Sequence, residues 1–375
     1  MDFTLSEEQE MLRTMARDFL TDKCPKTHVK AMEEDEKGYS PEMYAEMADL
    51  GWTGLVFPEE YGGSEMSFLD LAVLLEETGR ACLPGPFFST VVLGGLPILD
   101  AGSDTQKQEY LPKIASGEAI FTLALTEASG RYDAASIQIK ATADSDGYII
   151  DGTKLFVPDA NIADYILCAA RTDDNAEAGI TLFIVDAKSA GISHTVLKTM
   201  ANDKLCELVF DKVKVPKENI LGEPNKGWEP VKKIIEKATV AKCCTVIGAM
   251  ETVLDMTVEY AKERKQYDRP IGSFQVIQHY CANMAIDVDG SRYSTYQAAW
   301  MLSEGIQCHK EVAIAKAWIN EAFERFAASA HQIHGAIGVT IDHDLQYYTK
   351  RAKAAALTLG SSDYHREIVA AEMGL

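Results

Sequence analysis

The spacing of apolar residues changes twice along the chain, and each change indicates a different kind of structure. Up to about residue 120 the spacing is helical, with Met11, Met15 and Phe19 recurring every three or four positions. Between residues 121 and 216 apolar and polar residues alternate, as in 137–141 and 180–185, which predicts strands. From residue 227 helical spacing returns in two long stripes: Cys243, Ile247, Met250, Leu254 and Val258, then Val312, Ala315, Ile319, Phe323, Phe326 and Ala330.

This pattern predicts an α+β protein with a helical domain over 1–120, a β domain over 121–226 and a second helical domain over 227–375. Within the β domain, Asp146-Gly147 and Asp151-Gly152 predict tight turns, and 208–216 predicts the closing strand. No unit of fixed length repeats, which disfavours a solenoid.

Composition narrows the class of protein. The chain has 375 residues, with 36 basic and 57 acidic side chains and a formal charge of −21, so it lacks a general surface for nucleic acid or anionic lipid. The acidic start differs from a secretory signal, and no run approaches the roughly 20 apolar residues of a spanning helix. The eight cysteines form no C-x-x-C pair and no zinc-like cluster with histidine. We therefore expect a cytoplasmic protein with reduced thiols, no membrane segment and no metal.

Several segments, taken in order, carry a more specific signal. The run 263–275 reads Glu-Arg-Lys-Gln-Tyr-Asp-Arg-Pro-Ile-Gly-Ser-Phe-Gln, and 331–338 reads His-Gln-Ile-His-Gly-Ala-Ile-Gly. Earlier come Leu-Gly-Trp at 50–52, Val-Phe-Pro-Glu-Glu-Tyr-Gly-Gly at 56–63 and Leu-Ala-Leu-Thr-Glu at 123–127. Together these segments resemble the acyl-CoA dehydrogenase family across essentially the whole chain.

The resemblance implies an acyl-CoA dehydrogenase-like α+β fold, with an N-terminal helical domain, a central antiparallel β domain and a C-terminal four-helix-bundle domain. It also implies bound FAD, an acyl-CoA substrate, and a homotetramer arranged as a dimer of dimers. Since nothing resembles the G-x-G-x-x-G fingerprint of nicotinamide enzymes, electrons from an oxidation are expected to pass to an electron-transfer flavoprotein.

The chemistry of the matching residues suits a dinucleotide. A guanidinium such as Arg264 can bind a pyrophosphate through paired hydrogen bonds, and a glycine lets backbone donors approach closely. The resemblance implies that Arg264, Gln266, Tyr267 and Gln275 reach the FAD of a neighbouring subunit. The full set of residues implied to contact FAD is Leu125, Thr126, Phe156, Arg264, Gln266, Tyr267, Ile271, Gln275, Gln332, Gly335, Ser361 and Asp363.

Some positions depart from the family pattern. Phe156 can stack on the flavin, but Pro158 replaces a threonine and has neither a hydroxyl nor a backbone donor. Tyr132 stands where a small serine commonly meets the ligand. Arg131 could pair with a CoA phosphate or with a second substrate carboxylate. An arginine that lies along the surface of a β turn, with no ligand role, explains it equally well. By resemblance, Glu236 contacts the CoA moiety, and Leu359 lies beside the substrate.

The family reaction needs a carboxylate beside the substrate, because a proton leaves the α carbon while the β carbon gives a hydride to flavin N5. At the usual place, just before Gly360, this chain has Leu359. The alternative place on the first long helix of the C-terminal domain holds Ala238-Thr239. Glu236 is only two residues away, but two residues turn a helix by about 200°, so it points elsewhere. The catalytic base is therefore unknown from sequence.

Three explanations remain open. The favoured one is an active enzyme whose base has moved, for a cyclic, already unsaturated or otherwise unusual acyl group, with the candidates Asp133, Asp342, Asp344, Asp363 and His365. The second is an FAD-holding subunit of a mixed complex that relies on a partner's carboxylate. The third is a flavoprotein of the same fold that reduces an enoyl thioester.

Overall fold

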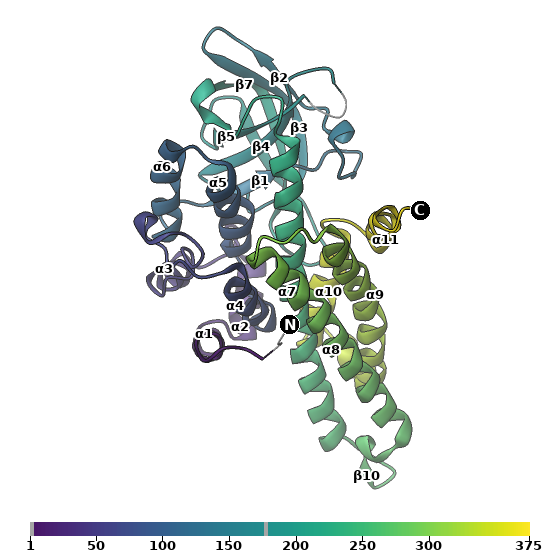
Figure 1. Ribbon diagram of the computed structural model, residues 1–375. Coiled ribbons are helices and arrows are strands. Elements are labelled where there is room, and N and C mark those ends of the chain that lie inside the picture. The colour runs from purple at the N-terminus through teal and green to yellow at the C-terminus, as the bar shows by residue number, and fades with distance from the viewer. Residues whose placement is uncertain (1–3, 176–178) are drawn as a thin grey trace. The chain divides into compact units, whose positions relative to one another are not determined.

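A computed structural model describes residues 4–175 and 179–375, and it confirms the predicted order of helices, sheet and helices (Figure 1). The longer helices are α1 (Glu7–Lys23), α2 (Lys26–Glu34), α3 (Pro41–Asp49), α4 (Phe68–Ala81), α5 (Leu96–Ala101), α6 (Asp104–Ala115), α7 (Trp228–Glu263), α8 (Gln275–Ser303), α9 (His309–His334), α10 (Leu345–Leu357) and α11 (Ser362–Glu372). A π-helix, η2 (Phe88–Gly95), precedes α5.

The strands are β1 (Phe121–Ala124), β2 (Lys140–Ala143), β3 (Gly147–Pro158), β4 (Tyr165–Arg171), β5 (Ile180–Asp186), β6 (Ile192–Val196), β7 (Leu205–Pro216) and β8 (Ile220–Leu221), with a separate hairpin of β9 (Lys265–Gln266) and β10 (Arg269–Pro270). The large sheet runs β6-β7-β3-β2-β4-β5-β8, and β1 also pairs with β4. Most pairs are antiparallel, as expected. However, β1 and β2 both pair with β4 in parallel, which strand alternation alone does not reveal.

One predicted turn is wrong. The chain does reverse at Asp146-Gly147, where the Asp144 N–H donates to the Gly147 carbonyl at 2.9 Å. The second pair, Asp151-Gly152, lies inside β3 at an irregularity in its pairing with β7. Gly152 has φ +144°, and a Cβ there would approach Ile139 to 2.7 Å, so the glycine serves close packing within the sheet.

The described residues form two compact units. The β-containing unit comprises 31–66 and 84–238, and the helical unit comprises 1–30, 67–83 and 239–375. Helices from the first 120 residues are thus divided between the two units, and the predicted domain limits at 120 and 226 stay predictions. No helix in the described ranges is long and apolar enough to cross a membrane.

Within the helical unit, α4 packs closely on other helices because glycines remove the side chains at the contact. A Cβ on Gly79 would lie 1.8 Å from the Thr245 carbonyl oxygen, and one on Gly248 would lie 1.8 Å from that of Glu76. The buried carboxylate of Glu76 accepts from Arg292 at 2.9 Å and from the Tyr296 hydroxyl at 2.8 Å. These contacts join α4 to α7 and α8.

Candidate active site

In the β-containing unit, a β-bulge in β3 presents Phe156 to solvent. The pairing of β3 with β7 shifts register between Lys154 and Val157, so Phe156 lies in the irregular part of the strand. Its φ is +54°, uncommon for a bulky residue, and the side chain is 55% exposed. Strained residues and bulges gather at functional sites. An exposed aromatic side chain in such a place can stack on a planar ring.

Hydrogen bonds bring the predicted residues Leu125 and Thr126 next to this bulge. The Leu155 N–H donates to the Thr126 carbonyl at 2.9 Å. The fully buried ammonium of Lys154 donates to the Leu125 carbonyl at 3.1 Å and to the Glu127 carboxylate at 2.8 Å. Three predicted flavin contacts are therefore held together by Lys154 and Glu127, two supporting residues outside the predicted set.

The predicted substrate residues of this unit lie nearer its surface. The exposed Arg131 donates to Asp133 at 2.7 Å, and Asp133 also caps the short helix 134–136 by accepting from the Ser136 N–H at 2.8 Å. Tyr132 and Glu236 are half-buried. Asp133 thus has a structural role that accounts for it.

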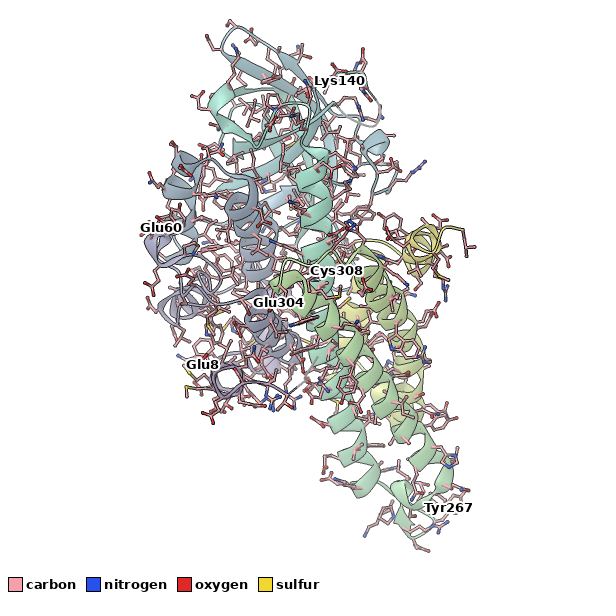
Figure 2. All side chains as sticks on the ribbon, in the orientation of Figure 1. Glu8, Glu60, Lys140, Tyr267, Glu304 and Cys308 are labelled. Carbon is pink, nitrogen blue, oxygen red and sulfur yellow. The ribbon has the colours of Figure 1, made fainter. Side chains whose placement is uncertain are left out.

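In the helical unit, the β9–β10 hairpin joins the ends of α7 and α8 (Figure 1). Its two turn residues, Tyr267 and Asp268, have φ +51° and +61°, as a tight two-residue turn requires. Tyr267 is 88% exposed and lies at the end of this unit (Figure 2). The polar side chains predicted to bind FAD at this hairpin, those of Arg264, Gln266 and Gln275, are also exposed.

Ile271 is the exception in this group, because it is buried. Its N–H donates to the Arg264 carbonyl at 2.8 Å, and this bond holds the base of the hairpin closed. The hairpin therefore projects arginine, glutamine and an aromatic ring on a fixed base, which suits a ligand bound outside the unit's own core.

A second candidate ligand-binding feature of this unit is the loop after α9. Gly335 has φ +62°, and its N–H bonds the His331 carbonyl to end the helix. Nearby, His334 Nε2 and His331 Nδ1 are buried with no hydrogen-bond partner in the described structure. Burial lowers the pKa of His334, so its ring is neutral. Unpaired buried polar atoms beside an exposed glycine and the exposed Gln332 fit a bound phosphate group.

The position of the usual base is apolar. Leu359 is buried with φ +61°, and its carbonyl accepts from His365 Nε2 at 2.8 Å. Burial, together with the charge of Lys316, lowers the pKa of His365 to about 4. Burial also lowers the pKa of Lys316 to about 8, and its ammonium donates to the Ala355 carbonyl at 2.6 Å. Thus a neutral imidazole and a lysine hold this segment.

The remaining candidates for a relocated base have ordinary surroundings. Ser361 caps α11 by accepting from a backbone N–H at 3.3 Å, and Asp363 pairs with Arg366 at 3.1 Å. Asp344 precedes α10, and Asp342 is exposed. Their roles as bases remain predictions. The alternative position on α7 is closed, because Ala238 and Thr239 are both buried.

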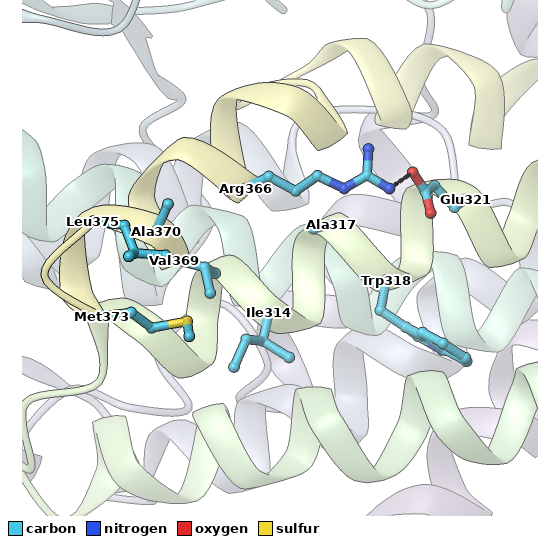
Figure 3. Close-up of a pocket in the computed structure, with 9 residues that line it drawn as sticks. All are labelled: Ile314, Ala317, Trp318, Glu321, Arg366, Val369, Ala370, Met373 and Leu375. Atoms are coloured by element: carbon cyan, nitrogen blue, oxygen red, sulfur yellow. Dashed lines mark hydrogen bonds and ion pairs between the residues drawn. The ribbon is translucent and has the colours of Figure 1, made fainter.

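The helical unit also has a cavity of about 380 Å³ beside α9 and α11 (Figure 3). An ion pair between Arg366 and Glu321 lies at this cavity. The rest of the lining is apolar and consists of Ile314, Ala317, Trp318, Val369, Ala370, Met373 and Leu375. None of the residues predicted to bind flavin or substrate lines this cavity. Within the described ranges, no cluster of three or more histidine, cysteine or acidic side chains could hold a metal.

The exposed aromatic on its bulge in the β-containing unit suits a planar ring, and the glycine loop of the helical unit, beside two imidazoles that each have one nitrogen unpaired among the described residues, suits a phosphate group. These features and the helical, β, helical order are consistent with the class that the family comparison shows, an FAD-dependent oxidoreductase that acts on a CH–CH group. Models of the acyl-CoA dehydrogenase N-terminal, middle and C-terminal domains match residues 6–118, 122–213 and 225–374. The chain belongs to the acyl-CoA dehydrogenase family.

Individual relatives extend over the whole chain. The 3-(aryl)acrylate reductase of Clostridium sporogenes is 32% identical, covering 98% of this chain and 99% of its own. The structure of butyryl-CoA dehydrogenase from Megasphaera elsdenii is 30% identical with a TM-score of 0.93, covering 100% of both chains. A chain in the ChsE4-ChsE5 complex from Mycobacterium tuberculosis is 29% identical with a TM-score of 0.92, covering 100% of this chain and 99% of that one.

Proposed function

We propose that this acyl-CoA oxidoreductase dehydrogenates an unusual acyl group, such as a cyclic or already unsaturated one, with a proton acceptor away from position 359. The observation that carries the proposal is the buried Leu359 at the usual place of the base, with Ala238 and Thr239 buried at the alternative one. Leucine and alanine cannot accept a proton. A substrate that loses its proton from another carbon needs the acceptor elsewhere.

The residues of the chain divide the remaining work. Bound FAD supplies the hydride acceptor. Phe156 stacks on the flavin ring, with Thr126 beside it, while Pro158 removes one backbone donor toward that ring. Arg264 and Gln275 hold the dinucleotide of a neighbouring subunit, which requires at least a second copy of the chain, and a homotetramer is the proposed assembly. An electron-transfer flavoprotein is the proposed electron acceptor.

Two other functions have support from particular relatives. The ChsE4-ChsE5 complex joins two different chains, which favours a subunit that uses a partner's carboxylate. The relative named 3-(aryl)acrylate reductase favours reduction of an unsaturated acyl group.

One anaerobic experiment separates the three. The chain purified alone should show flavin absorbance, and butyryl-, glutaryl- or cyclohexanecarboxyl-CoA should bleach it. If bleaching requires a co-purified second chain, the partner model is correct. If only dithionite-reduced protein reacts, and cinnamoyl-CoA restores its absorbance, the physiological direction is reduction. Colourless protein that stays apo with added FAD contradicts all three.

A separate substitution tests whether Arg264 binds FAD. Arg264→Ala should bind FAD about ten- to a hundredfold more weakly and retain less of it through gel filtration, because a charge-assisted phosphate contact contributes about 1.5–3 kcal/mol. Lys262→Ala is a matched control, since Lys262 is an exposed cation two residues away that pairs with Glu259 at the helix surface. Equal FAD content in the two variants would argue against Arg264 as a ligand.

A further inference from the structure

Residues 128–137 of the β-containing unit form a loop whose two ends are joined by one carboxylate. Glu127, at the start of the loop, accepts from the Gln138 N–H at 2.9 Å and from the Ile139 N–H at 3.2 Å, just past its end. The same carboxylate pairs with Lys154 at 2.8 Å. Because Lys154 borders the bulge in β3, hydrogen bonds and an ion pair connect the base of the loop to the strand segment assigned to the flavin.

Inside the loop, hydrogen bonds fix the turn that leads into the short helix 134–136. The Asp133 carboxylate accepts from the Ser136 N–H at 2.8 Å and from Arg131 Nε at 2.7 Å. The Ser136 hydroxyl donates to the Asp133 carbonyl at 2.6 Å. The Arg131 side chain is nevertheless 73% exposed. Its guanidinium is therefore oriented by Asp133 and still accessible to a ligand.

The loop is also held by an arginine from a distant part of the sequence. Arg171 is the last residue of β4, a strand that pairs with β1, β2 and β5. Its guanidinium donates to the Ala134 carbonyl at 2.5 Å and to the Ile137 carbonyl at 2.8 Å. It also donates to the Asn175 carbonyl, in the segment after β4, at 2.6 Å. One planar group thus joins the loop to the sheet, and the single ammonium of a lysine cannot reproduce this arrangement.

The bonds from Arg171 matter because the residues that accept them are buried. Ala134 and Ile137 are 6% and 2% exposed, and a buried carbonyl that loses its donor is unfavourable. Without the guanidinium, the middle of the loop should move so that water can reach these carbonyls. Its base would stay in place, because Glu127 keeps its own hydrogen bonds.

We propose that Arg171 is a positioning residue for the acyl-CoA site, because it fixes the part of the loop from which Arg131 and Tyr132 meet the thioester ligand. This rests on the function proposed above and on the ligand roles that the family resemblance implies for Arg131 and Tyr132. Arg171 directs its donors at backbone carbonyls, so it acts through the loop and changes ligand affinity. The pair of Lys154 and Glu127 instead supports the strand beside the flavin.

Ligand affinity in FAD-loaded protein tests the assignment. Calorimetric titration gives the dissociation constant of acetoacetyl-CoA, and turnover of butyryl-, glutaryl- or cyclohexanecarboxyl-CoA with an artificial electron acceptor gives KM and kcat. Arg171→Ala should raise the dissociation constant and KM about tenfold or more, because the ligand must then order the loop as it binds. The value of kcat should stay within about threefold and the FAD content should not change, because Lys154 and Glu127 remain.

Methylguanidinium separates the loss of the guanidinium from general damage to the fold. Arg171 is half-buried, so a small cation can enter the space left in Arg171→Ala and donate to the same carbonyls. It should restore most of the affinity in Arg171→Ala but not in Arg171→Met, whose side chain fills that space. Lys140→Met is the matched control, because Lys140 is an exposed cation on β2 in register with Arg171, and it should keep wild-type affinity.

A double-mutant cycle tests whether Arg171 acts through the side chains of the loop. In protein that carries Arg131→Ala and Tyr132→Ala, adding Arg171→Ala should weaken acetoacetyl-CoA binding by less than about threefold, because the side chains to be positioned are gone. An equal loss of affinity in both backgrounds overturns the proposal. Wild-type affinity and KM in flavin-loaded Arg171→Ala also overturn it.

If Arg171→Ala does not fold with FAD, Arg171→Lys decides. It keeps the charge but not the planar set of donors, so acetoacetyl-CoA should bind about three- to tenfold more weakly, and unchanged affinity overturns the proposal. Wild-type protein that binds acetoacetyl-CoA but oxidises none of the three acyl-CoAs contradicts the proposed function alone, because the affinities still test Arg171. Wild-type protein that binds no CoA thioester contradicts both.

Discussion

Replacing Lys154 with methionine should destabilise the β-containing unit and weaken flavin binding. Lys154 is completely buried, and its ammonium is 2.8 Å from the Glu127 carboxylate and 3.1 Å from the Leu125 carbonyl. Methionine has a similar length but no charge and no donor. The substitution would leave Glu127 as a buried carboxylate without its cation, directly beside the residues assigned to the flavin.

The size of this loss of stability depends on the hydrogen bonds that the Glu127 carboxylate still accepts in the variant. Breaking a buried ion pair by removing one partner costs about 3–5 kcal/mol. Glu127 still accepts from the Gln138 N–H at 2.9 Å and the Ile139 N–H at 3.2 Å, and its side chain is 10% exposed. These contacts place the cost near the lower end, about 3 kcal/mol, or roughly a hundredfold in the unfolding equilibrium.

Urea unfolding followed by circular dichroism measures this change, and flavin absorbance after gel filtration measures cofactor retention. Lys140→Met is the control, because Lys140 is an exposed lysine on β2 (Figure 2). The double variant Lys154→Met/Glu127→Gln should recover much of the stability, since the amide is neutral and still accepts both N–H groups. A loss below about 1 kcal/mol for Lys154→Met, or no recovery in the double variant, would refute the reasoning.

Three further outcomes are expected. Leu359→Glu should gain α,β-dehydrogenation of butyryl-CoA, measured as anaerobic bleaching; no gain with ligand demonstrably bound would mean that the acyl chain lies in a different pose. The pKa of His365 is lowered from 6.5 to about 4 in the folded protein. As the pH falls, the unfolded state therefore takes up this proton before the folded state does. The free energy of unfolding should fall by about 2 kcal/mol between pH 6.5 and 5. His365→Gln should reduce that loss in urea titrations at the two pH values, and an unchanged pH dependence would contradict the assignment. Gly79→Ala should lower stability by about 3 kcal/mol because its Cβ would lie 1.8 Å from the Thr245 carbonyl oxygen, and a melting temperature equal to that of wild type would disprove this close contact.

The sequence by itself determined the order of elements and the residue types at the site. Helical spacing and alternation depend on which face of a local segment is apolar, so they can be read without knowing the fold. In the run 263–275 and the loop 331–338, the residues that predict FAD binding are likewise close together in the sequence. The absence of a carboxylate at Leu359 was also visible in the sequence.

Only the tertiary structure decided which distant residues support that chemistry. The exposure of Phe156 depends on a register shift between β3 and β7, and Asp151-Gly152 became strand rather than turn through packing on Ile139. The support that Lys154 gives to Glu127, 27 residues earlier in the chain, is visible only in the folded unit. Such relations arise from long-range pairing and burial, which local spacing does not encode.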